Sequence, residues 1–182
     1  LGDIPEKPYQ AFTRVYPSSY AMDQDVKDVV SKYQDIIDES QRSVGYTPYN
    51  ISRYDVGSYA TNAMAQEFNA DAAIINTGGV RADISSGQIT ISDIFEVLPF
   101  NNRVILVEMT GKELLNFTYK DGFIYNDGFD PYSLISNKTY KVAVIDYVFT
   151  HPSNKVFDNK PYTDTQVLVR DLTIEYMDSI FE

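Results

Sequence analysis

The stretch Asn76-Thr-Gly-Gly-Val-Arg81 contains residue types that could bind a polar ligand. Arg81 offers N–H donors in a fixed fork, which suits a carboxylate, a phosphate or a base edge. Asn76 carries both a donor and an acceptor. Gly78 and Gly79 allow positive φ and let another group approach the backbone closely. This stretch is therefore a candidate ligand site.

A purely structural interpretation accounts for the same residues. Asn76 could stabilise a tight turn with its side chain, and the glycines could serve only the geometry of that turn. Arg81 could form an ion pair with Asp83 or Asp93. The residues alone leave both interpretations open.

The charge and the single histidine limit the chemistry. The formal net charge is −11, which disfavours polyanionic partners such as nucleic acid or an anionic membrane. A hydrolytic site with two metal ions needs several His, Asp and Asn ligands, whereas this chain has one histidine, His151. We expect no metal site and no catalytic residue of that kind in this chain.

The length of 182 residues predicts one domain that buries about 70% of its unfolded surface. Residues 1–19 contain prolines without periodicity and predict an extended lead-in, leaving a domain over 20–182. The chain has no run of 18 apolar residues, so no transmembrane segment is expected. Its first residues resemble no signal peptide and include no initial methionine, so we expect a segment of a longer protein.

The candidate stretch follows a buried strand. "DAAIINT" is short and apolar, and would deliver Asn76 at its carboxyl end, where open sheets place ligands. Two helices are expected to begin at Asp55 and Ser92, the second ending before Pro99. The patterns predict further helices over 22–37, 111–120 and 165–181, strands over 102–110 and 138–149, and a surface loop over 121–136.

Three segments in order resemble one family. "GSYATNAM", "NTGGVRADISSGQIT" and "VLPFNNRVILVEMTGKELLNF" are similar to the C-terminal, substrate-binding domain of the 5′-nucleotidases, the family that includes UDP-sugar hydrolases and 2′,3′-cyclic-nucleotide phosphodiesterases. The likeness extends from about residue 46 to 149. It implies an α+β fold, with a mixed sheet flanked by helices.

The resemblance also implies a division of labour. In this family an N-terminal metallophosphoesterase domain holds two divalent metal ions, and the C-terminal domain binds the nucleotide or nucleoside substrate. We therefore expect that the catalytic domain lies outside this sequence and that this chain alone is inactive. The parent protein would be an extracellular, periplasmic or cell-surface hydrolase, with a bacterial source expected.

The resemblance assigns two aromatic residues to base stacking. Phe100 matches the first ring, and Tyr147 the second, with Phe149 as its rival because residues two apart on a strand share a face. Stacking of one base on a ring is worth about 1–3 kcal/mol. Phe100 in the core after a helix end is the structural alternative.

The resemblance gives the polar residues roles as well. Arg81 matches the arginine that reaches the phosphate or sugar, Asn76 would meet a base edge, and Gly78 and Gly79 would admit the ligand to the backbone.

Two departures from the family pattern affect this site. An expected arginine is replaced by Asn50, and Arg53 could substitute for it. The family's Gly-Gly-Asp-Gly loop, which binds ribose, is replaced by "HPSNKVFD", where Asp158, Asn154 or no residue takes that role. A non-catalytic binding module that keeps the fold is therefore the alternative to nucleotide recognition.

Overall fold

The computed structural model describes residues 23–181 and separates into two units at the boundary between Ile37 and Asp38. The two units are described separately. The expected lead-in over 1–19 lies outside the described residues. The domain over 20–182 stays a prediction.

Two short helices replace the single helix expected over 22–37. They are α1 (Gln24–Ser31) and α2 (Gln34–Ser40). Between them, the N–H groups of Lys32 and Tyr33 donate to carbonyls three residues back instead of four. This tighter turn interrupts the helix.

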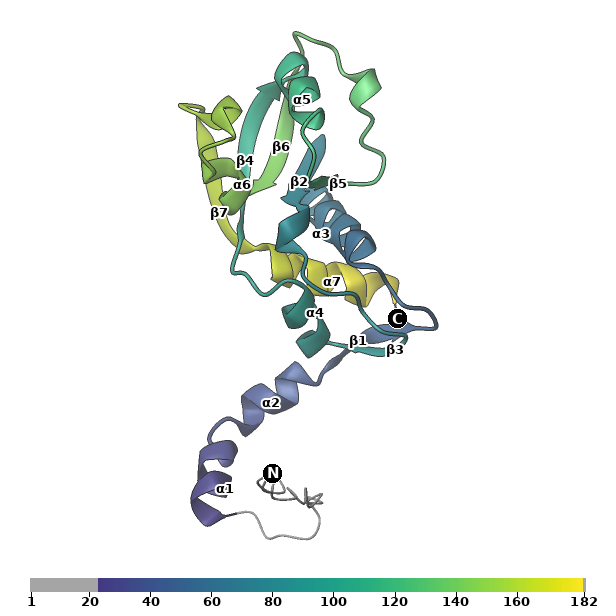
Figure 1. Ribbon diagram of the computed structural model, residues 1–182, viewed down its shortest axis with the longest axis vertical. Coiled ribbons are helices and arrows are strands. Elements are labelled where there is room, and N and C mark those ends of the chain that lie inside the picture. Colours follow the sequence, from purple (N-terminus) through teal and green to yellow (C-terminus); the bar gives the residue numbers. More distant parts are fainter. Residues whose placement is uncertain (1–22, 182) are drawn as a thin grey trace, which may run out of the picture. The chain divides into compact units, whose positions relative to one another are not determined.

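The second unit is built on a mixed five-stranded sheet of order β5-β2-β6-β4-β7 (Figure 1). Its strands are β2 (Ala72–Asn76), β4 (Arg103–Thr110), β5 (Phe123–Tyr125), β6 (Thr139–Ile145) and β7 (Tyr162–Leu168). β2 runs parallel to β6, and the other neighbours are antiparallel. A separate antiparallel pair joins β1 (Ser43–Thr47) to β3 (Gly87–Thr90). The fold is α+β, as predicted.

Helices cover both faces of the five-stranded sheet. Ile124 of β5 lies against Gly57 of α3 (Arg53–Phe68), whereas Phe123 packs its ring 4.7 Å from that of Phe117 in α5 (Gly111–Thr118). Adjacent strand residues point to opposite faces, so α3 and α5 lie on opposite sides. β6 is accordingly buried throughout Val142–Ile145.

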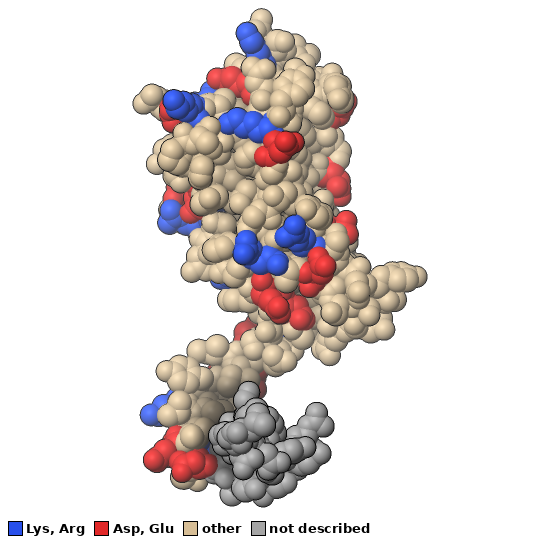
Figure 2. Space-filling view, viewed as in Figure 1, with Lys and Arg blue, Asp and Glu red and all other residues tan. Residues whose placement is uncertain are grey.

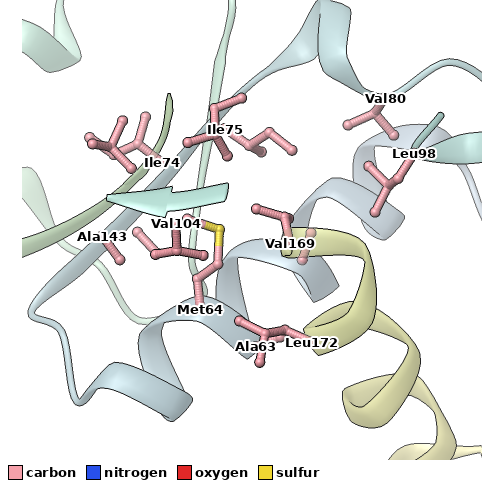
Figure 3. Close-up of a cluster of buried hydrophobic side chains, with 14 of the residues drawn as sticks. Ala63, Met64, Ile74, Ile75, Val80, Leu98, Val104, Ala143, Val169 and Leu172 are labelled. Carbon is pink, nitrogen blue, oxygen red and sulfur yellow. The ribbon is translucent and has the colours of Figure 1, made fainter. Parts of the chain in front are cut away.

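One part of the core lies between the sheet, α3 and α7 (Val169–Ile180) (Figure 3). Met64 of α3 and Val104 of β4 are fully buried and lie close to Val169 of α7. Burying each such side chain stabilises the fold by about 1.5–3 kcal/mol. This packing fixes the strands whose ends carry the candidate site.

Side-chain caps begin four α-helices of the described residues, and two of these caps differ from expectation. α3 is capped by Ser52, whose hydroxyl accepts from the N–H of Asp55, so Asp55 is not the cap. α4 (Ile91–Val97) is capped by Thr90 and not by Ser92. In both cases the true cap lies two or three residues earlier, where the backbone is still extended.

Three other segments also differ from the sequence prediction. The expected loop over 121–136 contains edge strand β5 and the 3₁₀ turn η3 (Pro131–Ser133). The first part of the expected terminal helix is strand β7, followed by α7. The strand expected over 138–149 ends at Ile145, where α6 (Asp146–Thr150) begins. Further single turns are η2 (Thr77–Gly79) and η4 (Lys155–Phe157).

None of the helices within residues 23–181 is long and apolar enough to span a bilayer.

Candidate functional site

One end of the sheet gathers most of the residues predicted for the site. Val104 at the start of β4 pairs with Ile145 at the end of β6, and Val144 pairs with Ile74 of β2. The segment before β4 and the segments after β6 and β2 therefore leave the sheet at the same end. These segments carry Phe100, Tyr147 and the stretch from Asn76 to Arg81 respectively (Figure 1).

Both predicted stacking rings are available at the surface. The exposed fraction is 49% for Phe100 and 52% for Tyr147. Phe100 is therefore not a core residue. Phe149 is half-buried, with its ring 5.3 Å from Phe157 and 4.7 Å from Tyr162.

The helical conformation of α6 separates Tyr147 from Phe149. The argument that these two residues share a face assumed a strand, and that assumption is wrong. In a helix, residues two apart point about 200° away from each other. Tyr147 is thus the ring that a ligand could reach, whereas Phe149 packs inward.

Asn76 and the two glycines form a closely packed unit. A Cβ added to Gly79 would lie 3.0 Å from the Asn76 Oδ1, and one added to Gly78 would lie 3.3 Å from Nδ2. Neither glycine has positive φ, so these positions provide space and not an unusual backbone conformation. The Asn76 Oδ1 is buried without a hydrogen-bond partner among the described residues. Because Oδ1 is buried, the Asn76 Nδ2 is the atom of this amide that could donate a hydrogen bond to a ligand.

Arg81 is exposed and lies at the edge of this unit. Its Nη1 donates to the carbonyl of Gly78 at 3.2 Å, and its backbone N–H donates to Val97 at 2.8 Å. Asp93 instead accepts from Thr90 in the cap of α4. Within residues 23–181, Arg81 forms no ion pair with Asp83 or Asp93, so its guanidinium remains able to meet an anion.

Arg53 lies on the segment next to Arg81. Its backbone N–H donates to the Asp83 carboxylate at 2.7 Å, and an Ile51–Ile84 bridge joins the two segments. The Arg53 Nη2 donates to the Tyr54 hydroxyl at 3.1 Å. This geometry holds the Arg53 guanidinium against Tyr54 at the start of α3.

The turn that carries Phe100 is held by a residue that the sequence analysis missed. Arg170 of α7 is buried and donates to the carbonyl of Leu98 at 3.1 Å and to the Asn101 Oδ1 at 2.8 Å. Its guanidinium also lies 3.7 Å from the centre of the Phe95 ring. No local signal in the sequence pointed to Arg170, because Leu98 and Asn101 lie 72 and 69 residues away from it along the chain.

A small pocket of about 10 Å³ lies between Phe100 and the loop that contains Gly78 and Gly79, called the glycine loop below. Gly79, Asn102 and Arg170 are among the residues that line it. This volume holds at most one water, so a base would have to lie on the exposed face of Phe100. The pocket shows that the glycine loop and Phe100 are close neighbours.

A larger open groove of about 690 Å³ lies towards the opposite end of β4. Its two lysines already have partners: Lys160 lies 3.0 Å from Glu113, and Lys141 donates to the carbonyl of Phe68. The groove is therefore less suited to an anion than the end with Arg81. On the face shown in Figure 2, basic side chains likewise lie in small groups beside acidic ones.

In the segment "HPSNKVFD", which replaces the family's ribose-binding loop, some side chains already form hydrogen bonds within the fold. Asn154 is buried, donates to the carbonyl of Val148 at 2.9 Å and accepts from Lys120 at 3.1 Å. Asp158 is exposed. The His151 ring lies 5.5 Å from that of Tyr147, and its Nδ1 is bonded to Ser153. Of the two predicted ribose contacts, Asn154 is thus held by hydrogen bonds to the fold, whereas the Asp158 side chain forms none within residues 23–181.

The described residues do not fit a dimetal centre. No group of three or more His, Cys, Asp or Glu side chains within residues 23–181 could hold a metal ion. No chemical step in this part of the chain is therefore assigned to a metal.

Comparison with known proteins finds a similarity to one family. Residues 31–117 match the family model described as 5′-nucleotidase, C-terminal domain. A 5′-nucleotidase of Vibrio cholerae is 39% identical over 71 residues, which cover 37% of this chain and 13% of that protein. Protein UshA of Escherichia coli is 33% identical over 63 residues, covering 35% of this chain and 12% of that protein.

Solved structures show the same fold over more of the chain. A 5′-nucleotidase precursor from Thermus thermophilus has a TM-score of 0.67 at 20% identity and covers 91% of this chain and 42% of its own. A putative 5′-nucleotidase from Staphylococcus aureus, in complex with α-ketoglutarate, has a TM-score of 0.65 at 15% identity, covering 89% and 42%. The chain thus spans about two fifths of these structures and a smaller share of the curated relatives.

Proposed function

We propose that this chain is a C-terminal domain of the 5′-nucleotidase family and that it recognises a nucleotide or nucleoside at the sheet end that carries Phe100 and Tyr147. The base would stack between the two rings. Asn76 would contact the base edge, and Arg81 would meet the phosphate or sugar.

The observation that carries this proposal is the pairing of Val104 with Ile145. It brings the two segments with exposed rings to one end of the sheet, although 46 residues separate Phe100 from Tyr147 in the sequence. An exposed aromatic ring is costly to leave in water, and a base has a π-face that stacks on either side. Two such rings at one sheet end suit a flat aromatic ligand.

The exposed Arg81 guanidinium at this end favours an anionic ligand over a neutral one. Arg81 forms no carboxylate ion pair within the described residues, and Arg53 lies on the neighbouring segment. A guanidinium binds phosphate through two parallel hydrogen bonds, which makes it specific as well as strong. This supports a nucleotide as the ligand, with its phosphate on the Arg81 side.

Hydrolysis is proposed for a longer parent protein and not for this chain. The relatives are named as 5′-nucleotidases, and this chain spans only part of them. A metallophosphoesterase domain of the same parent would supply two divalent ions and the catalytic residues, while this domain presents the substrate. An exported or cell-surface parent is part of the same proposal.

Titration calorimetry with AMP, adenosine and adenine tests the recognition of the base. Removing a stacking ring by Phe100→Ala should weaken AMP binding by about 1–3 kcal/mol, or about 5- to 150-fold in Kd. Tyr132→Ala is the matched control, because Tyr132 is 90% exposed and lies in η3, away from the site. Equal affinity of the wild-type chain and Phe100→Ala for AMP would refute stacking.

A second function, a binding module without ribose recognition, is favoured by one observation. Asn154 is buried and bonded to Val148 and Lys120, so it cannot also hold a sugar. If this function is correct, adenine and adenosine will bind with equal affinity. A clear preference for adenosine would instead indicate that Asp158 or another group contacts the ribose.

A further inference from the structure

Arg103, the first residue of β4, joins two carboxylates beside Tyr147. Its Nη2 lies 3.1 Å from the Asp164 Oδ2, and its Nε lies 3.8 Å from the Asp146 Oδ2. Both contacts are ion pairs that act through charge, and the 3.8 Å contact is too long for a hydrogen bond. The two carboxylates are more buried than the arginine, with exposed fractions of 26% and 24% against 41%. Their attraction to Arg103 is therefore only partly screened.

Asp146 connects this cluster to the ring of Tyr147. Its Oδ1 accepts from the backbone N–H of Tyr147 at 2.8 Å, while Oδ2 faces Arg103. Helix α6 has five residues, and the residue before it, Ile145, provides no side-chain cap. A helix this short has little stability of its own. Its first turn therefore depends on Asp146 and on what holds that carboxylate.

Asp164 is held by an irregularity in the edge strand β7. The pairing with β4 skips from Asp164 to Leu168, and Gln166 between them has a φ of 62°, a conformation uncommon for residues other than glycine. The Asp164 Oδ1 accepts from the Gln166 N–H at 3.0 Å. The Thr165 hydroxyl replaces a strand hydrogen bond by donating to the carbonyl of Val104 at 2.8 Å. This bulge aims the carboxylate at Arg103.

We propose that Arg103 is a positioning residue, which sets the orientation of Tyr147 by holding Asp146 and Asp164 together. Without the guanidinium, the two carboxylates would face each other across the start of β4 without a cation between them. Their repulsion would displace the first turn of α6 and with it the Tyr147 ring. The consequence for ligand binding rests on the proposed function, whereas the consequence for the ring itself does not.

The first test measures the ring without any ligand. The natural chain has no tryptophan, so Tyr147→Trp places a single fluorescent reporter at the ring. Adding Arg103→Gln should increase the amplitude of fast motion in the time-resolved anisotropy, and Arg103→Lys, which keeps the charge but not the fork, should give an intermediate value. Arg42→Gln is the matched control: Arg42 is 46% exposed and also forms an ion pair, with Glu39 at 3.1 Å. An unchanged decay in Arg103→Gln overturns the proposal.

The second test asks whether Arg103 acts on the ligand through Tyr147. Calorimetry compares Arg103→Gln in the natural background and in Tyr147→Ala. We expect AMP to bind about 3- to 10-fold more weakly in the first background and with no further loss in the second. Equal losses in both backgrounds would mean that Arg103 contacts the ligand itself, which contradicts a positioning role. If the wild-type chain binds no nucleotide, the proposed function fails, and the anisotropy measurement still decides the role of Arg103.

Discussion

Replacement of Arg170 by methionine tests how the turn that carries Phe100 is held. The guanidinium is 7% exposed and donates to the Leu98 carbonyl and the Asn101 Oδ1. Asn101 is exposed and can bond to water instead, so the main loss is the hydrogen bond to Leu98. A buried acceptor without a partner costs about 1–3 kcal/mol.

Two further effects change the free energy of unfolding of Arg170→Met. The contact with Phe95 is worth about 0.5–1 kcal/mol, the lower part of the usual range, because that ring is 46% exposed. Methionine recovers part of the cost of burying the cation, and the Arg170 Nε is already buried without a hydrogen-bond partner among the described residues. The expected net loss in the free energy of unfolding is about 1–3 kcal/mol. For a chain of this length, the midpoint should fall by about 2–12 °C.

Thermal and urea unfolding followed by circular dichroism measure this loss. Arg42→Met serves as the control, since Arg42 forms an exposed ion pair worth less than about 1 kcal/mol. Arg170→Lys should be nearly as unstable as Arg170→Met, because one ammonium cannot reproduce the fork. If Arg170→Met is as stable as the wild type or more so, the reasoning is refuted, and the buried cation is a net cost to the fold.

Two other predictions concern the opposite end of β4. Gly111→Ala should destabilise the fold by more than about 2 kcal/mol, because its Cβ would collide with the backbone carbonyl of Ile135; a urea midpoint equal to that of Lys112→Ala would contradict this. Burial tends to raise the pKa of Glu113, but hydrogen bonds from Thr110 and Lys160 outweigh it and lower that pKa below its ordinary value. The stability that Glu113 contributes should therefore be complete above the ordinary value of about 4.3 and be lost as the pH falls below it. Measuring the free energy of unfolding of the wild type and of Glu113→Gln from pH 7 to pH 3 checks this. A difference between the two proteins that stays constant over that range would refute it.

Much of the fold could be predicted because local patterns and burial agree. The apolar run of β2, with Asn76 at its end, follows directly from the residues. β7 was mistaken for helix because "TQVL" has apolar residues at mixed spacing, and its pairing with β4 is a tertiary effect that no local pattern reports. Edge strand β5 was missed for the same reason, since its three residues form a strand only beside β2.

The ligand-binding roles of the candidate site residues stay predictions, and the residues that hold these side chains in place could not be predicted from the sequence. Phe100 and Arg81 are exposed at the expected end of the sheet. The choice between Tyr147 and Phe149 depended on a change from strand to helix at Asp146, which the run "VAVIDYVF" does not reveal. Arg103 and Arg170 were missed because their partners lie far away in the sequence, at Asp146, Asp164 and Leu98.

The packing of Gly78 and Gly79 around the Asn76 amide has a consequence for how such sequences are read. The paired glycines make room for a neighbouring side chain of the same loop, so the Asn-x-Gly-Gly pattern encodes the internal shape of that loop. A related chain could keep this pattern after losing every contact to a nucleotide. Whether such a chain binds a ligand should be judged from the positions equivalent to Phe100 and Tyr147, whose rings are about half exposed in this chain.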